Sequence, residues 1–301
     1  MTRLAALGGA IVISFSAVFY ALSGVDPVSG TFFRLVYALP VLFLLWWIRR
    51  GDDQRPLRSR LMAFVAGLIV ALDLITWQTS IDYIGTGLAT LLANLQVVIV
   101  AVVAWLILGE VPSRGLKVAI PIVLFGVALV SGVGQADAFG DDPILGTVFA
   151  LVAAVLYAGF LLIYRQSNRI QAPPAGPLLE ATTGAVVMTL LVGWIGPDID
   201  FTPSWPAHGW LVALALGGFL TGWLLISYAL PRLPAAETST FILIQPALTM
   251  VWGAMIFSER PSTLQLWGAV IVLAGVAFVA VAQTRSQPTV PDEPALETGQ
   301  R

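Results

Sequence analysis

The chain has 301 residues, of which 58% are hydrophobic and only 11% are charged. A soluble domain carries about 25% charged residues, and the mean hydropathy of +0.89 is that of a membrane protein. The chain has no cysteines, which excludes disulfides, thiol catalysis and thiolate metal sites. The net charge of −2 is uninformative by itself, because the positions of the charges matter more. We expect neither a cofactor nor a nucleic-acid partner.

Apolar segments follow one another along the whole sequence, each near the roughly 20 residues that cross a bilayer as a helix. They predict an all-α integral membrane protein with ten transmembrane helices, the lipid bilayer around it and no soluble domain. The expected spans are Leu4–Ser23, Val28–Ile48, Arg60–Ile81, Gly85–Leu108, Leu116–Ser131, Pro143–Tyr164, Pro177–Ile195, His208–Leu230, Pro234–Phe257 and Leu264–Ala282. Residues 283–301 are polar and rich in proline, which predicts a disordered cytoplasmic tail.

The basic residues indicate how these spans are oriented. If the N-terminus is cytoplasmic, 13 of the 15 lysines and arginines fall on the cytoplasmic side. Only Arg260 then lies outside, and Arg34 lies within a span. Because cytoplasmic loops carry the excess of basic residues in membrane proteins, we predict that both termini are cytoplasmic.

A duplicated segment divides the chain into two halves. Residues 86–130 align without a gap with residues 235–279, which lie 149 positions further on, and 13 of the 45 pairs are identical. Five spans separate the two copies, and an odd number places them on opposite sides of the membrane. The pattern predicts two inverted five-helix repeats, residues 4–131 and 143–282, as in secondary transporters.

Two opposite charges lie at nearly the same depth in consecutive spans. We expect Arg34 and Asp73 to form an ion pair, because either charge alone would be costly inside a bilayer. The pair could serve only to lock the two spans together. Alternatively, Asp73 takes up a proton or binds the ammonium group of a substrate. Trp77 shares the helical face of Asp73, and Gln78 flanks that face.

The repeat also aligns Gln96 with Gln245, which predicts one paired binding centre near the middle of the membrane. Asn94 and Gln96 would point about 200° apart on a continuous helix, so only one of them is expected to face a cavity squarely. Glu237 shares a face with Gln245 and is a candidate for proton coupling. The alternative is that the two glutamines only join helices by hydrogen bonds.

Aromatic side chains add to the predicted binding surface. Besides Trp77, those at membrane depth on the candidate cavity helices are Tyr20, Tyr157, Phe160, Trp223, Phe241 and Trp252. Taken singly, each is equally consistent with packing between helices. As a set, they favour a cavity for aromatic or bulky apolar solutes.

Acidic residues at the ends of predicted helices are further candidates for structural contacts. Glu110 and Glu259 follow the fourth and ninth spans at opposite membrane faces and are interpreted as helix-end anchors. Glu180 begins the seventh span on the cytoplasmic side. There it is expected to meet a basic residue, for which the candidates are Arg165, Arg169 and Arg232.

Short motifs at corresponding positions indicate a family. The steps Gly109-Glu110 and Ser258-Glu259 close the fourth and ninth spans, and Phe33-Arg34-Leu35 lies early in the second. Together with ten short helices in inverted halves, these motifs resemble the EamA-type exporters of the drug/metabolite transporter superfamily, above all the bacterial aromatic amino acid exporters. The resemblance covers residues 4–282.

The resemblance implies an alternating-access carrier in the bacterial inner membrane, which we expect to be a monomer. It implies a central cavity lined mainly by spans 1, 3, 4, 6, 8 and 9. Spans 5 and 10 would be peripheral, with Gly126 and Gly275 allowing close helix contact.

The leading prediction is a secondary carrier that exports small amphipathic metabolites, most of all aromatic and other neutral amino acids. The first alternative is an exporter of drugs, purines or other metabolites. A different class, an intramembrane enzyme, would need a nucleophile with its base or a metal cluster at membrane depth. Neither an HExxH nor a Gly-x-Ser-x-Gly motif occurs in the sequence.

Overall fold

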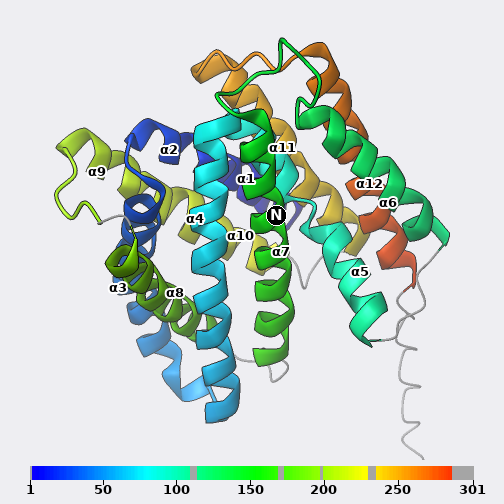
Figure 1. Ribbon diagram of the computed structural model, residues 1–301. Helices are drawn as coiled ribbons and strands as arrows, with labels where there is room; N and C mark the ends of the chain where they lie inside the picture. Colours follow the sequence, from blue (N-terminus) through cyan, green and yellow to red (C-terminus); the bar gives the residue numbers. More distant parts are fainter. Residues whose placement is uncertain (1, 109–113, 169–172, 197–198, 230–234, 287–301) are drawn as a thin grey trace, which may run out of the picture.

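The computed structural model describes residues 2–108, 114–168, 173–196, 199–229 and 235–286. Within these residues every regular element is a helix (Figure 1). In chain order the helices are α1 (Thr2–Ser14), α2 (Ser16–Ser23), α3 (Pro27–Arg49), the 3-10 turn η1 (Arg50–Asp52), α4 (Leu57–Ala93), α5 (Gln96–Leu108), α6 (Arg114–Val130), α7 (Pro143–Ser167), α8 (Ala175–Ile195), α9 (Trp205–Val212), the π-helical segment η2 (Ala213–Thr221), α10 (Gly222–Ala229), α11 (Ala235–Ile256) and α12 (Thr263–Ser286).

Seven helical segments in the described part of the chain are long and apolar enough to cross a membrane. They are Thr2–Ser23, Pro27–Asp52, Leu57–Ala93, Pro143–Ser167, Ala175–Ile195, Trp205–Ile226 and Thr263–Val281. Two shorter apolar helices, Gly115–Val130 and Ile244–Ile256, accompany them. The protein is therefore an all-helical membrane protein, and the arrangement as ten spans in inverted halves stays a prediction.

Two of the long helices begin at the same kind of cap. Asp26 precedes α3 and accepts hydrogen bonds from the amides of Val28 and Ser29, each at 2.9 Å. Asp142 precedes α7 and accepts from the amide of Leu145 at 2.9 Å. In both helices proline follows the cap, where its missing amide hydrogen costs nothing and its fixed φ suits the first turn.

The segment expected to form the third and fourth spans departs from a pair of regular helices. α4 bends sharply at Gly85, whose φ of 77° and ψ of 171° are non-helical. The expected span Gly85–Leu108 is not one continuous helix, because a turn at Asn94 and Leu95 separates α4 from α5. Across this turn the amides of Asn94 and Val97 bond to carbonyls three residues back.

The eighth predicted span is irregular in a different way. Its middle, η2, is a nine-residue π-helical segment between α9 and α10. The hydroxyl of Thr221 donates to the carbonyl of Leu216, five residues back, at 2.6 Å. π-helical segments are rare and are often found at functional sites.

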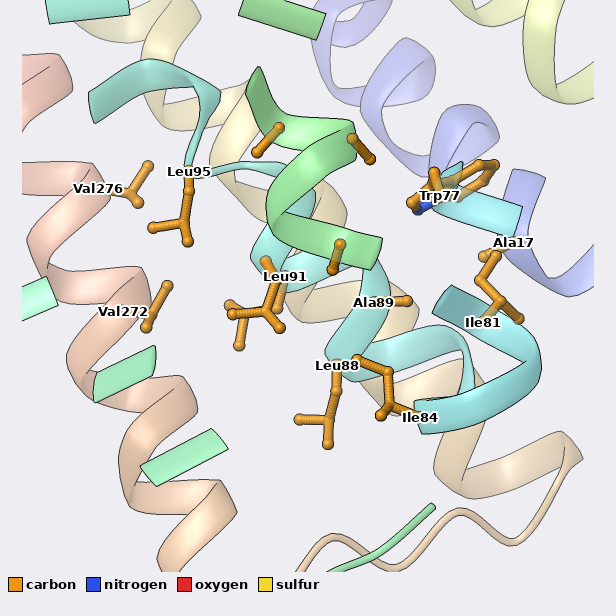
Figure 2. Packing of buried hydrophobic residues seen from close by; sticks show 14 of the residues in the cluster. Ala17, Trp77, Ile81, Ile84, Leu88, Ala89, Leu91, Leu95, Val272 and Val276 are labelled. Carbon is orange, nitrogen blue, oxygen red and sulfur yellow. The ribbon is translucent and has the colours of Figure 1, made fainter. Parts of the chain in front are cut away.

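The helix α4 lies at the centre of the bundle, beside α7 and α8 (Figure 1). Its buried side chains belong to one cluster with those of α12. Figure 2 shows Leu91 of α4, and Leu95 of the turn that follows, on the side of Val272 and Val276. The helices α6 and α12 lie side by side at one edge of the bundle. There a Cβ at Gly126 would lie 3.0 Å from the carbonyl oxygen of Gly268, and one at Gly275 would clash with Val123. These two glycines allow close contact between α6 and α12, as expected.

Candidate functional site

A cavity of about 380 Å³ lies among the helices. Its polar lining consists of Ser16, Arg34, Asp73, Thr90, Asn94, Gln96, Thr182 and Gln245. Its aromatic lining consists of Trp77, Tyr157, Phe160, Tyr164, Phe219 and Trp223. Pockets for small ligands measure about 300–1,000 Å³ and are mostly apolar with a few placed polar groups, so the cavity suits a small metabolite with a flat apolar part.

Most of the predicted site residues meet in this cavity. Nine of them line it, namely Arg34, Asp73, Trp77, Asn94, Gln96, Tyr157, Phe160, Trp223 and Gln245. The side chains of Glu237 and Phe241 lie outside the described residues. The structure thus brings together residues from both halves of the chain, including the two glutamines that the repeat aligns.

Three predicted residues are placed elsewhere. The Tyr20 hydroxyl donates to both carboxylate oxygens of Asp82, at 3.2 and 3.1 Å. Gln78 is fully buried and accepts a hydrogen bond from the hydroxyl of Thr31. Trp252 donates from Nε1 to the hydroxyl of Ser14 at 3.0 Å. These side chains join helices, because each bonds to a residue of a different helix.

Asn94 and Gln96 both line the cavity, which corrects the expectation that only one would face it. The expectation assumed a continuous helix, with about 100° of rotation between neighbouring residues. The turn between α4 and α5 breaks that geometry, so residues two apart come to one wall. The amide nitrogen of Asn94 donates back to the carbonyl of Thr90 at 2.8 Å. The side-chain oxygen of Gln96 is buried and accepts no hydrogen bond from the described residues.

Arg34 and Asp73 face the same cavity without a direct bond. Both are only 6% exposed, yet no ion pair joins them among the described residues. The guanidinium carbon of Arg34 instead lies 5.7 Å from the ring centre of Trp77 and 5.3 Å from that of Phe219. The expected salt bridge is therefore replaced by contacts with aromatic rings.

Several other residues that line the cavity are not predicted from the sequence. Phe219 lies in the π-helical segment, where a period of 3.6 residues does not tell which side chains face inward. Thr182 and Leu178 come from α8, and Leu35 comes from α3, next to the predicted Arg34. These two helices correspond to the second and seventh predicted spans, which the resemblance did not place among the main cavity helices.

At one end of the bundle a buried carboxylate bonds to α4. Glu259 is 7% exposed and accepts hydrogen bonds from the amide and hydroxyl of Thr86, at 2.6 and 2.8 Å, and from the amide of Gly87 at 3.1 Å. These amides begin the helical part of α4 that follows Gly85. Glu259 is thus a helix-end anchor, as predicted, but for a helix far from it in sequence. Glu110 lies outside the described residues.

The opposite end of the bundle carries a network of charged side chains. Arg55 donates from Nε and Nη2 to the two oxygens of Asp53, both at 2.8 Å. Glu180 pairs with Arg55 at 2.9 Å and with Arg60 at 2.6 Å. Among the described residues Glu180 pairs with Arg55 and Arg60 and not with Arg165, because the start of α8 packs against the loop between α3 and α4. The other two expected partners, Arg169 and Arg232, lie outside the described residues.

Electrostatics stabilise this network in its charged form. The hydrogen bond from Arg55 holds the pKa of Asp53 below its ordinary value. Burial alone would lower the pKa of Arg55. The hydrogen bonds and charges of Asp53 and Glu180 outweigh that effect and raise this pKa.

Solved structures share the fold. One crystal structure superposes on the chain with a TM-score of 0.61 at 17% sequence identity, covering 94% of this chain and 97% of the other. At this identity the similarity concerns the fold alone. The likeness extends over nearly the whole chain, so the described helices adopt a fold already seen in a solved structure.

Relatives with similar sequences are named as transporters. An uncharacterised transporter of Archaeoglobus fulgidus is 24% identical over 277 residues, which cover 90% of this chain and 93% of that protein. The uncharacterised transporter sll1319 of Synechocystis is 23% identical over 82% of this chain and 77% of its own length. The pseudopaline exporter CntI of Pseudomonas aeruginosa is 25% identical over 84% of this chain and 85% of its own.

The sequence profile of the EamA-like transporter family matches the chain twice, at residues 2–132 and 144–281. The two matches together cover most of the sequence. With relatives named as transporters, they place the chain among membrane transporters and not among enzymes. The chain belongs to the EamA-like transporter family.

Proposed function

We propose that the protein exports small amphipathic metabolites, most of all aromatic and other neutral amino acids, by alternating access. The observation that carries this proposal is the composition of the cavity wall. Aromatic rings such as Trp77 and Tyr157 lie beside one guanidinium, one carboxylate and three side-chain amides. Rings suit a flat apolar side chain, whereas the polar groups suit a zwitterionic backbone.

We further infer that ten spans form two inverted repeats in the bacterial inner membrane, with both termini cytoplasmic and the chain acting as a monomer. The double match of the family profile supports two repeats, and the distribution of basic residues supports the orientation. Reporter fusions at residues 52 and 137 test the topology. The first is expected to report the cytoplasm and the second the outside, and the reverse result contradicts the orientation.

Transport is tested with the purified full-length protein in proteoliposomes. Counterflow of labelled phenylalanine is expected, and it is to be measured with and without a pH gradient to show whether protons are coupled. In cells, overexpression is expected to give resistance to a toxic aromatic amino acid analogue. Empty liposomes and the double variant Gln96→Leu/Gln245→Leu serve as controls. If no amino acid gives flux above empty liposomes, the proposal is wrong.

A second candidate substrate class is another small metabolite that is not an amino acid. It is favoured by the relative from Pseudomonas aeruginosa, which is named as an exporter of pseudopaline. Resistance to unrelated toxic compounds without resistance to amino acid analogues would favour this candidate.

A further inference from the structure

Arg34 is the only basic residue among the described residues that line the cavity. Its side chain is 6% exposed, and its Nε and Nη1 atoms are buried without any hydrogen-bond acceptor. Buried charges in proteins are normally paired and fully hydrogen-bonded, because taking them out of water is costly. Arg34 therefore lines a cavity of ligand size while two of its donors are buried and unsatisfied.

Two aromatic rings stabilise the guanidinium group without using these donors. Trp77 on α4 and Phe219 on η2 contact it with ring centres at 5.7 and 5.3 Å. Such contacts stabilise a cation through the faces of the rings. The N–H groups of a guanidinium point outward in its own plane and remain available to an acceptor. The surroundings of Arg34 thus hold the charge and leave its hydrogen-bonding capacity unused.

The shape of an arginine selects the class of acceptor. A guanidinium offers parallel N–H groups along two edges, Nε with Nη2 and Nη1 with Nη2, and each unsatisfied donor of Arg34 belongs to one of these edges. Either edge matches the two oxygens of a carboxylate, and this bidentate pair is stronger than a neutral hydrogen bond. Asp73, the only acidic residue among the described lining residues, is not bonded to Arg34. It is therefore free to face the positive group of the same solute.

We propose that Arg34 is the carboxylate anchor of this cavity and the residue that makes the carrier prefer carboxylates over the corresponding amines. The proposal rests on the transport function above and names the chemical group that the solute must carry. Arg34 binds the carboxylate in the plane of its guanidinium group, while Trp77 and Phe219 hold that group in place. A solute without a carboxylate leaves the buried donors unsatisfied and binds less tightly.

Three probes of similar size separate the two ends of the solute. They are phenylalanine, phenethylamine, which lacks the carboxylate, and 3-phenylpropionate, which lacks the ammonium group. Binding is measured from the ligand-dependent rise in Tm of the purified full-length protein, and transport is measured as counterflow in proteoliposomes. The wild type is expected to bind both carboxylates at least about tenfold more tightly than phenethylamine, as a hydrogen bond to a charged group predicts.

The variants Arg34→Gln and Arg34→Lys test whether the preference for carboxylates depends on Arg34. Arg34→Gln is expected to raise the Kd of both carboxylates by about 10- to 100-fold and to leave that of phenethylamine within about threefold. Arg34→Lys keeps the positive charge but lacks the paired N–H groups. It is therefore expected to recover only part of the affinity for carboxylates. Arg50→Gln is the matched control, because Arg50 also contacts a tryptophan ring but lies exposed outside the cavity. If Arg34→Gln does not fold, the proposal is tested with Arg34→Lys and with the order of the three Kd values measured on the wild type.

The possible results distinguish a failure of the proposed role of Arg34 from a failure of the proposed amino acid export. If phenylalanine is transported but the wild type binds the amine equally well, the anchor is wrong and amino acid export stands. The anchor is equally wrong if Arg34→Gln weakens all three probes alike. If phenylpropionate binds through Arg34 but no amino acid is transported, the anchor stands and amino acid export is wrong. If neither carboxylate binds to the wild type, the anchor is overturned.

Discussion

At the scale of single residues, the side-chain oxygen of Gln96 takes no part in joining helices among the described residues. A glutamine that joins helices would use its side-chain oxygen as an acceptor. The oxygen of Gln96 is buried and accepts nothing from the described residues. Both Gln96 and Gln245 line the cavity, so their amides are placed to meet a polar solute.

Replacing either glutamine by leucine is expected to reduce transport by about three- to tenfold, the size of one lost hydrogen bond, with the amount of protein in the membrane unchanged. Counterflow and immunoblotting measure the two quantities. Gln166→Leu, which changes an exposed glutamine of α7, controls for added hydrophobicity. Full transport by both cavity variants would contradict a binding role.

Asp53 gives a prediction about pH. Its carboxylate is 4% exposed and bonds twice to Arg55, which lowers its pKa below the ordinary 3.8. A depressed pKa means that the contribution to stability is complete above about pH 4 and is lost as the pH falls through the folded-state value. Asp53→Asn is expected to lower the free energy of unfolding by about 1–3 kcal/mol at neutral pH.

The same substitution should flatten the loss of stability in acid. Thermal unfolding of the purified protein between pH 3 and 7, a range that brackets the ordinary carboxylate pKa of about 3.9, measures both effects. Asp52→Asn changes an exposed neighbour and should leave Tm unaltered. An equal effect of the two variants would show that the bond to Arg55 contributes nothing.

At the scale of elements, the interruptions of α4 place the site. Gly85 has a φ of 77° and a ψ of 171°, a conformation that is essentially restricted to glycine. A Cβ at this position would lie 2.7 Å from the carboxyl carbon of Glu259. The bend and the anchor therefore depend on each other, because the bend exposes the amides of Thr86 and Gly87 that Glu259 binds.

Gly85→Ala is expected to destabilise the protein by about 1–3 kcal/mol, the usual cost of a strained backbone. Gly209→Ala is the control, since no atom lies within 4 Å of the Cβ that it adds and alanine favours a helix. Thermal unfolding of the two variants in the same detergent makes the comparison. A loss in Gly85→Ala no larger than in the control would show that the backbone there is not strained.

At the scale of the whole molecule, the cavity lining reaches one end of the bundle. It includes Pro174, directly before α8, at the end that carries the Arg55–Glu180 pair. Glu259 bonds to α4 at the other end, where Tyr20 also bonds to Asp82. From these bonds we infer that the conformation is closed at the Glu259 end, which we predict to face outward.

Because the chain has no cysteines, single introduced thiols report this closure without further engineering. Thr182→Cys lies on the cavity wall and is expected to react with an impermeant maleimide added at the cytoplasmic side but not outside. Adding Glu259→Gln, which weakens the closure, should increase labelling from outside severalfold. Asp137→Cys, in an exposed loop, is the control for outside access. Unchanged labelling with Glu259→Gln would contradict a role for Glu259 in closure.

Particular residues show which parts of the candidate site can be predicted from the sequence. The repeat found Gln96 and Gln245, because their alignment does not depend on helix geometry. Helical spacing correctly placed Asp73 and Trp77 on one wall, because α4 is regular there. It failed for Asn94 beside the turn and for Phe219 in the π-helical segment, where the rotation per residue changes. The partner of Glu180 was missed because packing between distant segments leaves no periodic signal.

The opposite charges on the cavity wall have an electrical consequence. When Arg34 and Asp73 are both ionised, the cavity carries no net charge, with or without a zwitterion. The cycle then moves no charge across the membrane, and its rate is independent of the membrane potential. When Asp73 is protonated, the cavity carries one positive charge, and each 100 mV changes the energy of moving it by about 2.3 kcal/mol. Transport at set potentials therefore reports the protonation state of Asp73 during the cycle.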